Sequence, residues 1–322
     1  MREDILDELR TEYENRRYED EMLHSRKVAE IMERIPEIGR LTERRQQLIR
    51  NALRGILDGN AKAENIPAEM EKLNQQIGDI LEKNGMARNS LEPVYRCPVC
   101  EDKGYTGEPV RTMCSCMKIR YQEKLRKAIG LENDHGETFD TLDESILSEE
   151  NLPGKDYSQR ALTVMVRDRC KQWAATYPDN EIRNILLMGQ TGLGKSFLMH
   201  AMAEKLIERG QDVLMISAYR FLEIARAGYF NNSMDEMKEL VDADVLLLDD
   251  LGSEPLMQNI TVEQLFVLVN ERQRRGKATV ISTNLNKAEF RERYTERITS
   301  RLMDARQSVV LTLMGADVRM RK

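Results

Sequence analysis

Eight residues between an apolar run and a helical stretch constrain the fold of this chain more than any other segment. They read GQTGLGKS, with the spacing G-x-x-x-x-G-K-S from Gly189 to Ser196. The run before them, 182–188, has the length of a buried strand, and the apolar spacing of 197–208 is typical of a helix that ends near Gly210. A strand, a glycine-rich turn and a helix N-terminus form an anion site, because consecutive backbone N–H groups point into the turn. The motif therefore predicts a nucleoside triphosphate site.

Two side chains in this turn are expected to act directly on the nucleotide. Lys195 is expected to reach the β- and γ-phosphates, and the Ser196 hydroxyl to hold Mg²⁺. The backbone amides of the turn are expected to face the phosphates. The predicted nucleotide-binding segment is Gly189, Gln190, Thr191, Gly192, Leu193, Gly194, Lys195 and Ser196.

The composition bounds the classes of protein to which the chain can belong. With 322 residues it is long enough for two domains, and 32% charged and 5% aromatic residues are typical of a helix-rich protein with large solvated faces. A net charge of −6 argues against a uniformly basic nucleic-acid surface but leaves room for a local basic strip. The charged start is unlike a signal peptide, and the apolar runs are far below the ~20 residues that cross a bilayer. We therefore expect a cytoplasmic protein with reduced cysteines and no membrane partner.

Strand-like runs alternate with helix-like segments from about residue 156 onward. After 182–188, the strand-like runs are 212–216, 243–248, 277–282 and 308–313. Alternation on this scale favours a parallel α/β sheet that helices cover on both faces, because each parallel connection needs a crossover.

Two carboxylates follow the strand-like run 243–248. The segment VLLLDD, residues 245–250, places Asp249 and Asp250 after an apolar strand. Asp249 is expected to hold Mg²⁺ through water or Ser196, and Asp250 to orient or deprotonate the attacking water. Many P-loop ATPases have Glu at the second carboxylate position. Asp250 is one methylene shorter than Glu, so we expect slow hydrolysis or assistance from Glu254. In isolation, the pattern also fits a strand that ends in a polar turn.

Four of the five cysteines form the pattern C-x2-C-x13-C-x-C within residues 93–117. Two close pairs joined by a loop supply the four soft ligands that tetrahedral Zn²⁺ prefers, so we expect a closed, structural zinc site. The C-x-C half is tighter than usual, which leaves His135 as another possible fourth ligand, and buried inert thiols are the alternative to a metal site. Cys170 is expected to be a core thiol. The predicted zinc ligands are Cys97, Cys100, Cys114 and Cys116.

The first 92 residues are predicted to be helical. Apolar residues recur at helical spacing in 28–35, 41–57 and 70–81, which proline and short polar breaks separate. We expect a small antiparallel bundle, and the pattern leaves open whether it is only structural or also docks a partner. Residues 118–155 are acidic and contain Gly and Pro, which predicts a linker.

The order of several motifs resembles a known family. These motifs are GQTGLGKS, VLLLDDLGSE, ISTNL, ERITSRL and GADVR. Together they resemble an AAA+ ATPase, and more narrowly a bacterial replicative helicase loader of the DnaC/DnaI type. The resemblance covers about residues 155–320, and the cysteine module extends it toward the DnaI-like branch. It implies a P-loop AAA+ domain with a five-stranded parallel sheet, helices on both faces and a lid domain that is absent or vestigial.

The resemblance assigns roles to polar residues after the carboxylate pair. Asn284 matches the sensor 1 residue, and Arg319 resembles sensor 2 and would contact the nucleotide. Arg301 matches an arginine finger that reaches a neighbouring subunit's ATP, a role that Arg297 could share. A finger in trans implies ATP-dependent self-association, because each site needs a neighbour. The catalytic set implied in this way is Lys195, Asp249, Asp250, Asn284 and Arg301.

The resemblance also implies contact with single-stranded DNA between the second and third strands. That segment contains Arg220, Arg226, Tyr229 and Phe230, which suit backbone tracking and base stacking. An amphipathic helix that buries its apolar face is the alternative interpretation of the same residues.

The main functional hypothesis is a loader of the replicative hexameric DNA helicase. Residues 1–92 and the zinc module 93–117 would dock the helicase, 118–155 would be a linker, and the AAA+ domain 156–322 would assemble into an ATP-bound spiral on single-stranded DNA. The alternatives are an IstB-like accessory ATPase for transposition, a zinc-module unfoldase of the ClpX type, and an adaptor that binds nucleotide without hydrolysing it.

Overall fold

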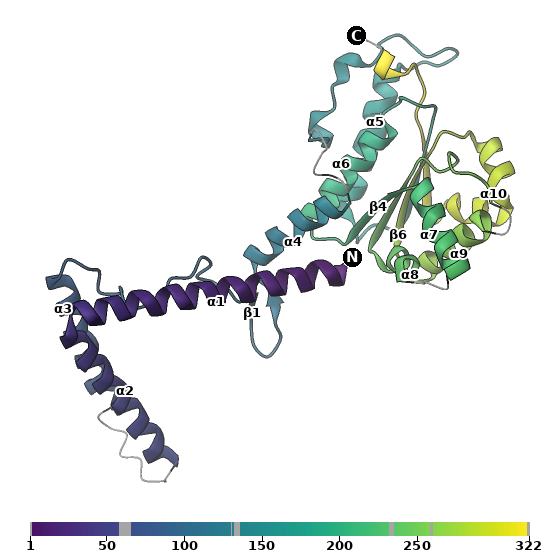
Figure 1. The fold of residues 1–322 in the computed structure, drawn as a ribbon. Coiled ribbons are helices and arrows are strands. Elements are labelled where there is room, and N and C mark those ends of the chain that lie inside the picture. Colours follow the sequence, from purple (N-terminus) through teal and green to yellow (C-terminus); the bar gives the residue numbers. More distant parts are fainter. Residues whose placement is uncertain are drawn as a thin grey trace. The chain divides into compact units, whose positions relative to one another are not determined.

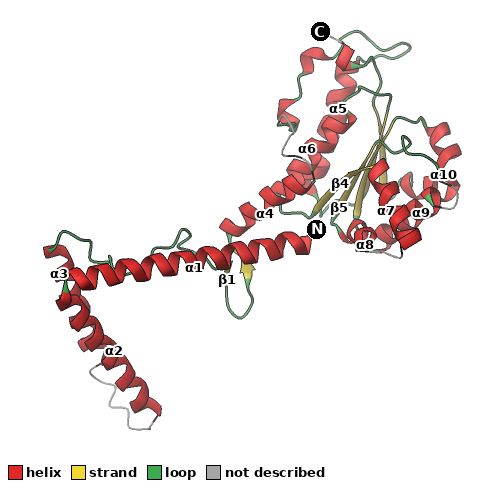
Figure 2. Cartoon of the chain, in the orientation of Figure 1, coloured by secondary structure: helices red, strands yellow, loops and turns green. Residues whose placement is uncertain are grey.

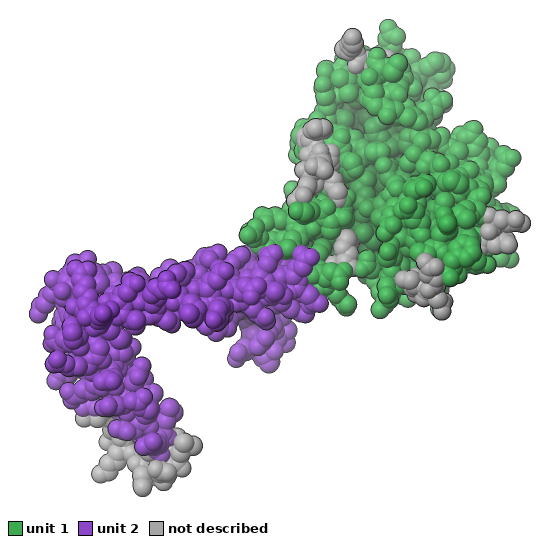
Figure 3. Space-filling model, in the orientation of Figure 1, with its two compact units in different colours: residues 1–6, 118–322 green, residues 7–117 purple. Residues whose placement is uncertain are grey.

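The structure is a computed structural model that describes residues 2–57, 66–129, 131, 136–231, 235–257 and 260–320. The chain divides into two compact units (Figure 3). One, here called the cysteine unit, comprises residues 7–117, and the other, the sheet unit, comprises residues 1–6 and 118–322. The domain boundaries expected from the sequence remain predictions.

Three helices and a small hairpin form the cysteine unit. The helices are α1 (Arg2–Arg34, in this unit from residue 7), α2 (Pro36–Leu57) and α3 (Ile66–Lys83), and the hairpin pairs β1 (Tyr105–Thr106) with β2 (Thr112–Met113). Pro36 begins α2, where its missing N–H costs nothing. A small core of five isoleucine and leucine residues joins the three helices: Ile31, Ile35, Ile38, Ile77 and Leu81. The predicted helical N-terminal region is confirmed.

Helix α1 extends much further toward the N-terminus than the apolar spacing predicted. Its first half is highly charged, and ion pairs one turn apart support it on the solvent side. Arg10 Nη1 lies 2.6 Å from Asp7 Oδ1, and Arg17 Nε lies 2.9 Å from Glu21 Oε1. Such pairs stabilise an exposed helix without an apolar stripe, which explains why hydrophobic periodicity missed this part.

The sheet unit contains five parallel strands in the order β4-β5-β6-β3-β7. Helices α5 and α6 lie on one face of the sheet, and α7 to α10 lie on the other (Figures 1 and 2). The strands are β3 (Asn184–Met188), β4 (Val213–Ser217), β5 (Val245–Asp249), β6 (Ala278–Thr283) and β7 (Ser308–Thr312). The helices are α5 (Gln159–Thr176), α6 (Lys195–Glu208), α7 (Ala218–Asn231), α8 (Asp235–Asp242), α9 (Thr261–Arg274) and α10 (Lys287–Leu302). The predicted five-stranded parallel sheet with helices on both faces is confirmed.

The position of β6 between β3 and β5 determines what meets at the carboxyl edge of the sheet. Met188 of β3 pairs with Thr283 of β6, and Leu248 of β5 pairs with Ile281. The glycine-rich turn after β3, the carboxylates after β5 and Asn284 after β6 therefore lie at one edge, where ligands of open parallel sheets bind.

The segment 118–155, for which the sequence predicted a linker, is partly helical and packs on the sheet unit. It contains most of α4 (Ser115–Ala128) and the 3₁₀ helices η2 (Phe139–Thr141) and η3 (Glu144–Ile146). Gln122 Nε2 donates to Ile207 O at 2.8 Å, and Arg126 Nε lies 2.9 Å from a Glu204 carboxylate oxygen. These polar contacts hold a segment whose acidic composition, with Gly and Pro, predicts a linker.

Three further findings complete the fold. After β7, the described residues add the short 3₁₀ helix η4 (Val318–Met320). Cys170 is fully buried in α5, as expected of a core thiol, and burial raises its pKa to about 12. Across the described parts of the chain, no helix combines the length and the apolar character that a membrane crossing requires.

Candidate functional site

The glycine-rich turn depends on backbone angles that favour glycine. Gly192 has φ +77° and Gly194 has φ +83°, so both lie in the left-handed region. A Cβ added at Gly192 would lie 1.9 Å from Asp317 Oδ1, whereas one at Gly194 would meet no atom within 4 Å. The backbone N–H of Val318 donates to Gly192 O at 2.9 Å, so the C-terminal segment closes over the turn.

Lys195 is held inside the turn by three oxygen acceptors. Its Nζ donates to Gly189 O at 2.7 Å, to Gln190 O at 2.8 Å and to Asn284 Oδ1 at 2.6 Å. Burial lowers the pKa of Lys195, while the carboxylates of Asp250 and Asp249 oppose that shift. An anion bound in the turn would favour the charged form of this buried lysine.

Asp249 accepts hydrogen bonds from both sides. Ser196 Oγ donates to its Oδ2 at 2.8 Å, and the Ser282 hydroxyl donates to its Oδ1. The arrangement orients a carboxylate and a hydroxyl toward each other, which is the oxygen-rich ligand set that Mg²⁺ prefers. The two residues predicted to hold magnesium are therefore in direct contact.

Asn284 links the lysine to the second carboxylate. Its amide oxygen accepts from Lys195, and its amide nitrogen donates to Asp250 Oδ1. Asp250 has φ +57°, a conformation that Asp tolerates better than most residues, and its N–H donates to Ser282 Oγ at 2.8 Å. The structure thus brings Lys195, Ser196, Asp249, Asp250 and Asn284 into one hydrogen-bonded network.

A cavity of about 580 Å³ opens over this network. Arg319 also lines it, and Arg319 Nη2 lies 3.0 Å from Asp317 Oδ2. Hydrogen bonds from Arg319 lower the pKa of the Asp317 carboxyl, and the arginine itself remains mostly exposed beside the turn.

Sequence reasoning missed one wall of this cavity. Residues of the segment expected to be a linker, among them Leu142, Ile146 and Leu147, line it together with the phosphate-binding turn. Apolar side chains in the same cavity as the turn suit the base of a nucleotide. The signal that could have found them is the apolar set within the acidic stretch TLDESIL.

Two other predicted residues lie elsewhere in the sheet unit. Arg301 is not among the described residues that line the cavity, and Arg297 is exposed on the same helix, α10. Glu254, considered as an aid to hydrolysis, is buried, where it accepts from Gly252 N at 2.7 Å and from Tyr294 Oη at 2.5 Å. These bonds indicate a structural role for Glu254.

The segment expected to contact DNA combines both interpretations on one helix. On α7, Phe221 is fully buried in the core, whereas Tyr229 and Phe230 are exposed and pack edge to face with centroids 5.2 Å apart. Arg220 pairs with Glu223 and Glu236, and Arg226 is exposed. The outer face therefore presents aromatic rings and a cation.

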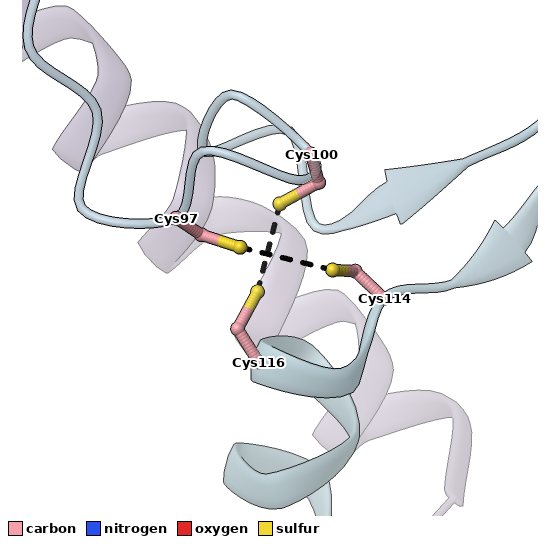
Figure 4. Close-up of side chains that lie close together, drawn as sticks. All are labelled: Cys97, Cys100, Cys114 and Cys116. Carbon is pink, nitrogen blue, oxygen red and sulfur yellow. Dashed lines mark hydrogen bonds between the residues drawn. The ribbon is translucent and has the colours of Figure 1, made fainter.

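The four cysteines of the predicted zinc site converge in the cysteine unit (Figure 4). Their sulfurs all lie within 4.8 Å of one another, with Sγ atoms 3.8 Å apart for Cys97 and Cys114 and 3.5 Å apart for Cys100 and Cys116. Tetrahedral ligands with Zn–S bonds of ~2.3 Å would be about 3.8 Å apart. The cluster can therefore hold a metal ion. His135, the alternative ligand, lies outside the described residues.

The backbone around the cluster is held in place by further hydrogen bonds. The buried Asp102 accepts from Arg96 N at 2.7 Å and from Cys97 N at 3.0 Å, and Tyr13 Oη of α1 donates to Cys116 Sγ at 3.3 Å. Backbone N–H groups of Cys100 and Val99 lower the pKa of Cys97 to about 7. Burial raises the pKa of Cys100 to about 12 and also raises the pKa of Cys116, so of these three thiols only Cys97 is close to the thiolate form that metals bind.

Residues 156–322, which lie in the sheet unit, match the family described as IstB-like ATP binding protein. The chain belongs to this family. It is an ATP-binding family, in agreement with the geometry of the turn.

Individual relatives carry the names that the motif order predicted. The "Replicative helicase loader DnaI" of Bacillus subtilis (strain 168) is 24% identical over 176 residues, which cover 54% of this chain and 52% of that protein. The "Replicative helicase loader DnaC" of Escherichia coli (strain K12) is 26% identical over 129 residues, 38% of this chain and 51% of that protein. The predicted resemblance to DnaC/DnaI proteins is confirmed, and the chain spans about half the length of these curated relatives.

A solved structure described as the DnaC helicase loader is also similar. It shares 18% identity and a TM-score of 0.47, and the match covers 57% of this chain and 99% of that one.

Proposed function

We propose that this protein is an ATPase that loads a replicative DNA helicase onto single-stranded DNA. The observation that carries the proposal is the network of Lys195, Ser196, Asp249, Asp250 and Asn284 at one sheet edge. The names of the relatives, two of which are helicase loaders, support the choice of helicase as the partner.

ATP would lie in the 580 Å³ cavity with its phosphates in the glycine-rich turn. Lys195 would bind the β- and γ-phosphates, and Arg319 would contact the nucleotide from η4. Ser196 and Asp249 would hold Mg²⁺, which neutralises phosphate charge when bound. Asp250 would orient the attacking water and accept its proton, and Asn284 would position Asp250 relative to the γ-phosphate.

Arg301 would complete the ATP site of a neighbouring copy. Its position outside the cavity of its own chain supports this role, because a finger acting in cis would need to line that cavity. Each site would then require a second protomer, so ATP binding would favour self-association into an open spiral.

The cysteine unit would dock the helicase, with zinc as its structural metal. Cys97, Cys100, Cys114 and Cys116 would hold Zn²⁺ and fold the loop around it. Apolar side chains on α1 support a docking role, because Tyr18, Met22 and Leu23 are more than half exposed. A hydrophobic face on a helix is a common way to bind a partner groove.

Single-stranded DNA would run along α7. Tyr229 and Phe230 are exposed by 56% and 65%, which leaves their rings free to stack on bases, and Arg226 would contact phosphates. The buried face of the same helix would hold the rings in place.

The test is deposition of the cognate helicase on closed circular single-stranded DNA, measured by co-sedimentation after a high-salt wash. We expect ATP and the full-length protein to be needed, and Lys195→Ala to be inactive as the matched control. Helicase retention that is equal with and without the protein would contradict the proposal. The family match favours a second candidate, an IstB-like accessory ATPase of transposition, for which stimulation of a transposase would be the expected activity.

A further inference from the structure

Arg301 is held by side chains of the neighbouring helix α9. Its Nε donates to Asn270 Oδ1 at 3.2 Å, and its guanidinium carbon lies 4.6 Å from the centroid of the Phe266 ring. A third contact comes from its own helix, where Nη1 donates to Arg297 O at 3.1 Å. A planar guanidinium that stacks on a ring and donates from its edge is restrained in both position and tilt.

The backbone of Arg301 also contacts helix α9. Gln273 Nε2 donates to Arg301 O at 3.1 Å. Phe266, Asn270 and Gln273 follow the spacing i, i+4, i+7, which places them on one face of the helix. One face of α9 therefore holds both the main chain and the side chain of Arg301.

Helix α9 is itself anchored to the sheet by a buried cation. Arg272 is fully buried, and its guanidinium donates to Leu240 O at 2.6 Å, to Ala243 O at 3.0 Å and to Thr279 Oγ1 at 3.1 Å. Because these acceptors lie at the end of α8, in the following turn and in β6, α9 cannot rotate without losing several charge-assisted hydrogen bonds. The face that holds Arg301 is thus fixed relative to the sheet.

We propose that Phe266 and Asn270 are positioning residues that orient Arg301 toward the ATP of a neighbouring copy. The inference rests on the proposed action of Arg301 in trans. A long arginine side chain samples many rotamers in solution, and a finger is effective only when its donors are already placed where charge develops. Phe266 and Asn270 remove that freedom before the neighbour binds.

Substitutions of Asn270 test the proposal in the full-length protein. Asn270→Leu keeps the volume and removes the acceptor, so we expect ATP turnover at assembling concentrations to fall about tenfold, the effect of losing one hydrogen bond to a charged group. Nucleotide affinity should be unchanged, because Asn270 lies outside its own chain's cavity. Asn270→Asp keeps an oxygen acceptor and should retain most of the turnover. Phe266→Leu should lower turnover in the same way as Asn270→Leu.

Mixing two variants distinguishes a loss of Arg301 positioning from a general loss of folding. A Lys195→Ala protomer cannot bind ATP but carries an intact Arg301 with its α9 contacts. In an equal mixture with Asn270→Leu, about one quarter of the sites pair an intact nucleotide site with an intact finger, since each site uses one neighbour. Turnover should therefore rise well above the sum of the two separate proteins. Damage to folding would not be restored by mixing.

Two outcomes distinguish failure of this inference from failure of the proposed function. If Arg301→Ala hydrolyses ATP as fast as the parent protein, action in trans is wrong. If Arg301→Ala is impaired and is restored by mixing with Lys195→Ala, action in trans holds. In that case, a fully active Asn270→Leu, or an impaired one that mixing does not restore, overturns the positioning role.

Discussion

Substitution of Gly192 by alanine should destabilise the sheet unit more than the same change at Gly194. Both residues have positive φ, and alanine in that region costs about 1–2 kcal/mol at either position. Only at Gly192 does the new Cβ meet a neighbour, at 1.9 Å from Asp317 Oδ1. The carboxylate end of Asp317 has to move, which breaks its hydrogen bonds with Arg319 N and Nε and costs about 0.5–1.5 kcal/mol, so Gly192→Ala should lose about 1.5–3.5 kcal/mol in total.

The assay is urea unfolding followed by the fluorescence of Trp173, which is the chain's single tryptophan and is buried in α5 of the sheet unit. Asp317→Ala removes the atoms that collide with the new Cβ. In the Asp317→Ala protein, Gly192→Ala should therefore lower the free energy of unfolding only by the cost of the left-handed backbone, the same loss as at Gly194. Equal free energies of unfolding for Gly192→Ala and Gly194→Ala would refute the reasoning, as would a cost at Gly192 that Asp317→Ala leaves unchanged.

Three other changes probe the remaining parts of the molecule. Lys195→Ala should abolish nucleotide binding because it removes the buried cation of the turn. The measurement is the equilibrium affinity for a fluorescent ATP analogue, and an affinity equal to that of the parent protein would contradict the prediction. Tyr13→Phe removes only the hydroxyl that donates to Cys116 Sγ, so a chelator should remove Zn²⁺ loaded into the cysteine cluster about tenfold faster than from the parent protein. An unchanged rate of release would exclude a role for that hydrogen bond. Leu23→Asp places a charge on the exposed apolar face of α1 and should reduce co-purification with helicase without changing ATP turnover; undiminished capture would place docking elsewhere.

Residues whose chemistry is local could be predicted from the sequence. The glycine-rich turn needs left-handed backbone at fixed positions, and a parallel sheet brings the ends of its strands together, so Lys195, Asp249 and Asn284 could be expected to meet. The two close cysteine pairs could be expected to converge for a similar reason, because a short loop limits their separation.

Residues whose role depends on tertiary packing could not be predicted in this way. The apolar set that contains Leu142 and Ile146 is visible in the acidic stretch TLDESIL, but the sequence does not indicate that it lines the nucleotide cavity, because that depends on how the segment packs within the sheet unit. Asn270 carries no signal at all, because its relation to Arg301 exists only once α9 and α10 are side by side. Burial of Glu254 likewise depends on Tyr294, forty residues further along the chain.

The charges around the nucleotide cavity have a consequence for what it recognises. Its described lining carries four carboxylates and two cations, a formal charge of −2, from Glu137, Asp143, Asp249 and Asp250 against Lys195 and Arg319. A bare nucleotide, itself an anion, meets the carboxylates of Asp249 and Asp250 beside the positive turn, and a divalent cation bound there would neutralise them. We therefore expect the cavity to bind nucleotide and metal together, so that ATP should bind more weakly when Mg²⁺ is removed.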